Sequence, residues 1–129
     1  MASSAPFDPA SPDLEPILLV LTNLPDRESA LALADGLVGA RLAACANVLA
    51  ECTSVYRWKD AVETAAEVPV LIKTRAGLYA DVEAFIRGHH PYEVPEVIAV
   101  TVQHGLGAYL QWVADETRFE APRGTKRKS

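Results

Sequence analysis

The stretch with the most chemically capable side chains is "HHPYEVPEV", residues 89–97. It holds two of the protein's three histidines, His89 and His90, side by side. Two imidazoles suit Cu(II), Zn(II) or Ni(II). A helix C-terminus also favours an imidazolium without any metal, and the side chains of adjacent residues diverge. The metal-site and helix-end interpretations both stay open, while His104 has no partner nearby in sequence.

The rest of this stretch predicts a rigid connection. Pro91 and Pro95 keep the backbone extended and fix where Tyr92 and Glu93 point. Such a segment is either a stiff link between a helix and a strand or one wall of a preformed pocket.

No other motif points to catalysis. The chain has no glycine-rich phosphate loop, CxxC, HExxH or nucleophile elbow. Cys45 and Cys52, taken as parts of one strand, would lie roughly 23 Å apart, too far for a disulfide, and would face opposite sides. We therefore predict a non-enzymatic protein with no catalytic residues and no obligatory cofactor, in the reducing cytoplasm.

Composition predicts one globular domain. Half of the 129 residues are hydrophobic, and before Pro122 there are 8 basic against 17 acidic residues, a balance of −9. This acidic body argues against a nucleic-acid partner, and no apolar run is long enough to span a membrane. We predict a disordered N-terminal arm (1–15), one domain (16–118) and a basic disordered tail (119–129).

Hydrophobic periodicity predicts alternating strands and helices. Residues 17–22 form an apolar strand, 43–58 and 62–74 form a long hairpin turning at 59–60, and 96–103 form another strand. Pro69 marks a bulge or an edge position in the hairpin. Three helices are expected, with these residues on their buried sides: Leu31, Ala34, Leu37, Val38 and Leu42, after an Asp26 N-cap; Leu78, Val82, Phe85 and Ile86, ending at Gly88; and Tyr109, Leu110 and Val113.

This order predicts an α+β fold: a ferredoxin-like βαββαβ sandwich with a long β-hairpin and an extra C-terminal helix. Two helices would cover one sheet face and leave an apolar face bare, which favours an oligomer. Tyr56 and Trp58, near the hairpin tip, are the expected interface anchors. Large obligate interfaces predict heat resistance beyond the ordinary range of about 45–65 °C.

Four segments together resemble the CutA family of divalent-cation tolerance proteins: "RLAACANVLAECTSVYRWKD" (41–60), "EVPVLIKT" (67–74), "HHPYEVPEVIAV" (89–100) and "GAYLQWV" (107–113). The resemblance covers about residues 17–117. It implies a homotrimer with an architecture similar to the PII signal-transduction proteins, and a link to tolerance of copper and other divalent metals.

The resemblance also implies candidate site residues. In copper-binding members the ligands match His89 and His90 plus a cysteine in the first strand, and that position is Leu21 here. It further implies an inter-subunit cleft around Glu67, Lys73, Tyr92 and Glu93. An ordinary ion pair between Glu67 and Lys73 of different subunits is an equally good interpretation of those two residues. Two functions follow as expectations: binding of Cu(II) or another divalent ion, or PII-like sensing of a small ligand.

Overall fold

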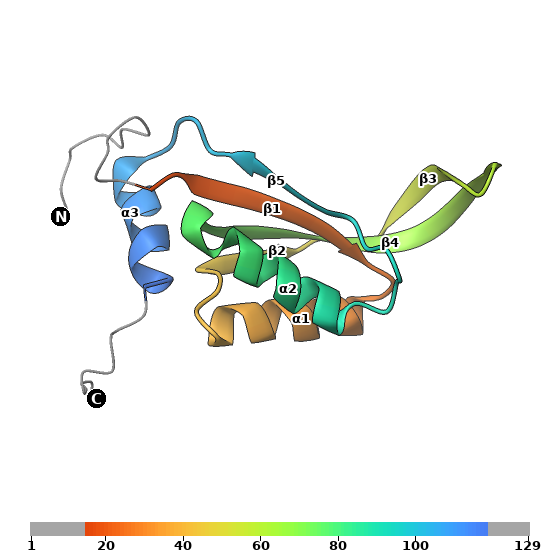
Figure 1. Cartoon of the computed structure of the whole chain (residues 1–129), viewed down its shortest axis with the longest axis horizontal. Coiled ribbons are helices and arrows are strands. Elements are labelled where there is room, and N and C mark those ends of the chain that lie inside the picture. Colours follow the sequence, from red (N-terminus) through yellow and green to blue (C-terminus); the bar gives the residue numbers. More distant parts are fainter. Residues whose placement is uncertain (1–14, 119–129) are drawn as a thin grey trace.

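The computed structural model describes residues 15–118; the predicted tail and all but Glu15 of the predicted N-terminal arm lie outside the described residues. Two helices cover one face of the sheet, and a third lies at the end opposite the hairpin (Figure 1). The elements are β1 (Ile17–Leu24), α1 (Arg27–Gly39), β2 (Cys45–Val48), β3 (Cys52–Trp58), β4 (Ala61–Arg75), η1 (Ala76–Leu78), α2 (Tyr79–His89), β5 (Val97–Thr101) and α3 (Gly107–Glu116).

The sheet runs in the order β2-β4-β1-β5, all neighbours are antiparallel, and β3 continues the pairing along β4. The α+β class, the antiparallel sheet and the extra C-terminal helix are therefore confirmed. Central β1 alternates, so that Leu18, Val20 and Leu24 face the helices. Burial of one strand face under two amphipathic helices builds the main core.

The buried face of α1 differs from the predicted one. Asp26 caps the helix as expected: its side chain accepts a 2.8 Å hydrogen bond from the Ser29 amide, and this bond lowers the pKa of Asp26. Leu31 and Val38, predicted to be buried, are 47% and 42% exposed. The helix packs on the sheet through an adjacent apolar stripe instead. Two apolar stripes overlap in this helix, and contact with the sheet decides which one is buried. The buried residues are Ala30, Leu33, Ala34 and Leu37.

The first arm of the hairpin is two strands, not the single strand 43–58. Val48 pairs with Val70 and Cys52 pairs with Glu67, so residues 49–51 lie opposite only two residues of β4. The Leu49 amide donates to the Pro69 carbonyl at 2.9 Å. This extra residue is a β-bulge, as the position of Pro69 predicted.

The bulge also overturns the prediction that the two cysteines face opposite sides. Cys45 pairs with Lys73 and Cys52 pairs with Glu67. Residues an even number apart on β4 share a face, so both thiols lie on the same side of the strand. Cys45 is half-buried and Cys52 is exposed.

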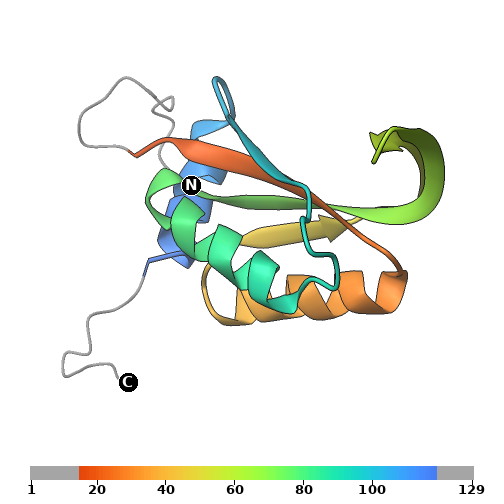
Figure 2. The ribbon, with the colours of Figure 1, turned by 45° about the vertical axis from the view of Figure 1, so that its right-hand side comes forward.

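The hairpin turns at Lys59 and Asp60, as predicted, and both residues have positive φ, 49° and 68°. Such two-residue turns favour Asn-Gly because few side chains tolerate positive φ. The hairpin projects beyond the sheet and curls (Figure 2).

Replacing this pair by Lys59→Asn/Asp60→Gly is expected to raise the free energy of unfolding by about 1 kcal/mol, because it relieves left-handed strain. Urea unfolding at fixed protein concentration measures the change. The matched control Lys59→Gln/Asp60→Ser also removes both charges, but it introduces no residue that favours positive φ, so no such gain is expected. Equal stability of the two variants would contradict the strain argument.

Two helix predictions need correction. α2 continues to His89, one residue beyond the predicted stop at Gly88. On α3, Leu110 and Val113 are buried against Ile17 as expected, whereas Tyr109 is 39% exposed. Its ring instead lies 5.6 Å from the exposed ring of Trp112. Tyr109 and Trp112 each precede a buried residue by one position, about 100° around the helix. Both pairs have the same spacing of three, so sequence spacing alone does not distinguish the buried pair.

The sheet face turned away from α1 and α2 remains largely uncovered in one chain. α3 covers one end of this face, where Leu110 and Val113 pack against Ile17. Leu21 and Leu71, in mid-sheet, are half-buried, while Ile98 and Val100 on the edge strand are 52% and 58% exposed. Within residues 15–118, no helix combines the length and hydropathy that crossing a membrane requires.

Candidate functional site

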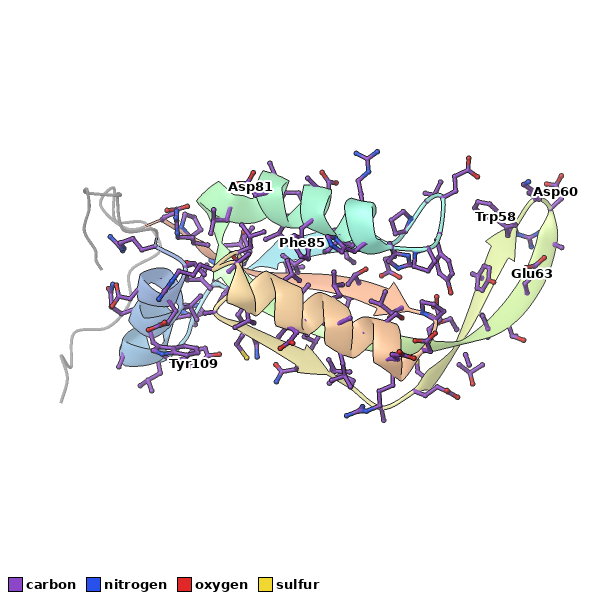
Figure 3. All side chains as sticks on the ribbon, turned by 90° about the horizontal axis from the view of Figure 1, so that it is seen from below. Trp58, Asp60, Glu63, Asp81, Phe85 and Tyr109 are labelled. Atoms are coloured by element: carbon purple, nitrogen blue, oxygen red, sulfur yellow. The ribbon has the colours of Figure 1, made fainter. Side chains whose placement is uncertain are left out.

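A pocket of about 630 Å³ lies between the hairpin and the loop that follows α2. Figure 3 shows Trp58 and Glu63 on the hairpin, across from this loop. Tyr56 and Trp58, predicted as interface anchors, contribute rings from β3, and Tyr92 contributes a third from the loop. The remaining uncharged lining residues are Asn23, Ser54, Val55 and Val94.

The charged side chains that line this pocket are all acidic. Glu63 and Glu67 come from β4, and Glu93 and Glu96 from the loop. Burial raises the pKa of Tyr92 above its usual range, and the negative charge of Glu67 raises it further. Tyr92 therefore stays a neutral phenol, and the pocket presents negative charge beside aromatic surface.

His90 fixes the loop that carries these residues. Its Nε2 lies 2.6 Å from the Asn23 carbonyl, and the Tyr92 amide donates to its Nδ1 at 3.1 Å. Because a carbonyl only accepts, Nε2 must carry the proton and donate, while Nδ1 is the acceptor. Both ring nitrogens of His90 are thus engaged, and His90 ties the loop to the end of β1.

His89 is placed differently. Its Nδ1 lies 2.8 Å from the Phe85 carbonyl and therefore donates to it, and its ring stacks on the Phe85 ring at 4.1 Å. The proton on Nδ1 leaves the Nε2 lone pair available. A histidine held in this way is the usual form of an imidazole metal ligand.

The residues of the implied copper site do not converge within one chain. His89 and His90 bond to different partners, and Leu21 lies in the middle of β1, opposite Leu71 and Ile98 on the uncovered face. Among residues 15–118, no three His, Cys, Asp or Glu side chains gather as a metal-binding group. A complete site would need ligands from a second chain.

Of the four residues expected in a cleft, the structure brings together three. Glu67, Tyr92 and Glu93 line the pocket, and Lys73 does not. The Lys73 ammonium instead contacts the Asn47 side chain and lies 3.8 Å from the Cys45 sulfur. A pairing of Lys73 with Glu67 across subunits stays a prediction.

Sequence reasoning missed six lining residues, among them Asn23, Glu63 and Glu96. Asn23 donates to Glu96 at 2.8 Å, joining the end of β1 to the loop. A two-residue turn at 59–60 sets the register of β3 against β4, so the predicted turn already implied that Glu63 lies opposite Tyr56. For Asn23 the sequence offered only a weaker signal of a site, namely a polar residue directly after an apolar run.

A protein-family model described as "CutA1 divalent ion tolerance protein" matches residues 18–116. The chain belongs to the CutA1 family. The CutA protein of Mus musculus is 42% identical over 101 residues, which cover 78% of this chain and 57% of the mouse protein. The chloroplastic CutA of Arabidopsis thaliana is 37% identical over 103 residues, which cover 80% of this chain and 57% of that protein.

The solved CutA1 structure from Thermus thermophilus superposes with a TM-score of 0.78 at 35% identity, covering 79% of this chain and 99% of that one. Against the mouse and plant relatives, by contrast, this chain spans only a little over half of their length. CutA proteins are not known as enzymes, in agreement with the absence of a catalytic motif from the sequence. The Arabidopsis thaliana relative is described as chloroplastic and the Archaeoglobus fulgidus CutA as periplasmic, so the family is not confined to one compartment.

Proposed function

We propose that this protein acts in divalent-cation tolerance as a non-enzymatic homotrimer that binds divalent metal ions. The observation that carries the proposal is the pocket lining: four glutamates without a lysine, arginine or histidine among the lining residues. The field of such a pocket concentrates cations. Family membership supplies the biological context.

The available donor atoms favour some ions over others. The four glutamates offer oxygen ligands inside the pocket, whereas His89, at the end of α2, offers its Nε2 outside the pocket lining. Oxygen with imidazole nitrogen suits Cu(II), Zn(II) or Ni(II), whereas Cu(I) prefers thiolate, which Leu21 cannot provide. We therefore expect divalent copper to be preferred over monovalent copper.

The uncovered sheet face supports the oligomer. Ile98 and Val100 present apolar side chains on the edge strand, and Val55 and Val62 are 66% and 63% exposed on the hairpin. Exposed apolar surface next to unpaired strand edges marks an association surface. The number three comes from the family resemblance, and a trimer would bring the hairpin of one copy to the sheet of another.

A second candidate function is PII-like sensing of a small ligand. The pocket volume of about 630 Å³ favours it, because small-molecule sites measure roughly 300–1,000 Å³ while a single ion needs far less. The three aromatic rings would then supply contact surface that a metal ion does not need.

The test is calorimetric titration of Cu(II) into the wild-type protein and two matched single variants. His89→Ala removes the available lone pair and is expected to weaken binding at least about tenfold. His104→Ala removes an exposed imidazole that does not line the pocket, so the affinity should change by less than about threefold. Equal affinities in the two variants would reject His89 as a ligand, and light scattering on the same samples would reject the trimer if it gave a monomer mass.

A further inference from the structure

The orientation of His89 depends on one neighbour, Phe85. His89 is an exposed residue at the end of α2, where a polar side chain ordinarily samples several rotamers. Here its Nδ1 donates to the Phe85 carbonyl at 2.8 Å. Its ring also stacks on the Phe85 ring, with the centroids 4.1 Å apart and the planes 17° from parallel. Two contacts with the same residue therefore fix the imidazole although it is exposed.

Capping of the helix end does not account for this arrangement. In an α-helix the carbonyl four residues back normally accepts from the backbone amide, so the Phe85 carbonyl needs no imidazole as a partner. The stack is a separate contact with a geometry that aromatic rings prefer. Together the two contacts hold the His89 proton on Nδ1 and leave Nε2 with a free lone pair in a fixed orientation.

A glycine on the neighbouring helix makes room for the Phe85 ring. Phe85 lies between α2 and α1 (Figure 3), and a Cβ at Gly36 would stand 2.8 Å from its Cζ and 3.2 Å from its Cε1. Glycine within a helix is less favourable than alanine. Packing on the core explains why Phe85 is partly buried, whereas the glycine opposite it indicates that this orientation of the ring is needed.

We propose that Phe85 and Gly36 are positioning residues for a divalent-metal ligand. Phe85 orients the His89 imidazole, and Gly36 keeps the Phe85 ring where it can stack. A methyl group at Gly36 would meet the tip of the ring, so the ring would rotate out of the stack. These contacts belong to the helix layer, on the opposite side of the sheet from the face that the proposed trimer buries, so assembly leaves them intact. This inference rests on the proposed metal-binding function, to which it adds the residues that orient His89.

The experiment compares two glycine-to-alanine variants of α1 in the full chain. Gly36→Ala places a methyl group against Phe85, whereas a Cβ at Gly39 meets nothing within 4 Å, so Gly39→Ala is the matched control. Nitrogen NMR of the metal-free protein at about pH 8.5, where free imidazole side chains are neutral, reports which nitrogen of His89 carries the proton. Wild type and Gly39→Ala should show it on Nδ1, and Gly36→Ala should move much of it to Nε2.

Calorimetric titration of Cu(II) into the same proteins gives the second readout. Gly36→Ala should weaken binding by about tenfold, the lower end of the loss expected when a partner that orients a metal ligand is removed. Gly39→Ala should weaken it by less than about twofold. Phe85→Leu should lose at least as much as Gly36→Ala. The double variant should lose no more than Phe85→Leu alone, because the glycine acts only through the ring.

Two results would overturn the inference: a His89 proton that stays on Nδ1 in Gly36→Ala, or equal losses of Cu(II) affinity in the two glycine variants. Thermal unfolding curves verify that each variant is folded. A wild-type protein that binds no Cu(II), while Gly36→Ala still moves the proton, would reject the proposed metal function and confirm that Phe85 and Gly36 orient His89.

Discussion

Val100→Lys is expected to convert the proposed homotrimer into monomers at micromolar concentration. Val100 is 58% exposed in one chain and lies beside Leu19 on the uncovered sheet face. If this face is buried between subunits, each copy would have to bury an unpaired ammonium, and burying an unpaired charge costs several kcal/mol. Light scattering should give about one third of the wild-type mass, and the unfolding temperature should fall together with it.

The control for this prediction is Leu31→Lys. Leu31 is 47% exposed on α1, in the helix layer rather than on the uncovered face. It therefore gains the same charge at a similarly exposed apolar position, and its mass should match the wild type. Dissociation in both variants would mean that added charge alone weakens the assembly, and dissociation in neither would remove this face from the interface.

Ile86→Ala is expected to lower the free energy of unfolding by about 2–5 kcal/mol. Ile86 is fully buried on α2, in the core between the two helices and the sheet. Truncation loses the transfer free energy of three carbons and leaves a cavity that close-packed neighbours fill only in part. Urea unfolding at fixed protein concentration measures this loss, since association would otherwise shift the midpoint.

Leu31→Ala serves as the comparison for Ile86→Ala. Its side chain is about half exposed, so the expected change is within about 0.5 kcal/mol. A loss at Ile86 no larger than at Leu31 would mean that α2 contributes little to the core, contrary to its burial in the structure.

Strand patterns were predictable because they depend on short-range physics. The apolar run of β1, the turn at 59–60 and the break at Pro69 all follow from local conformational preferences and from period-two burial. The family resemblance rests on the same segments, and the comparisons confirm it over residues 18–116.

Helix faces were harder to predict where two apolar stripes overlap. Leu31 and Val38 fit a helical stripe as well as Ala30 and Leu33 do, and contact with the sheet selects the second pair. Tyr109 was misplaced for the same reason on α3. Periodicity defines the spacing of a stripe, but the partner surface decides which stripe is buried.

The sequence by itself determined the order of the elements, the hairpin turn, the acidic balance of the chain and the family. Only the tertiary structure decided that His90 is engaged at both nitrogens while His89 keeps a lone pair, that one extra bulge residue places both cysteines on one side of β4, and that Lys73 lies outside the pocket within one chain. Such features depend on contacts between residues far apart in sequence. Asn23 and His90, 67 positions apart, meet only because β1 and the loop after α2 end at the same edge of the fold.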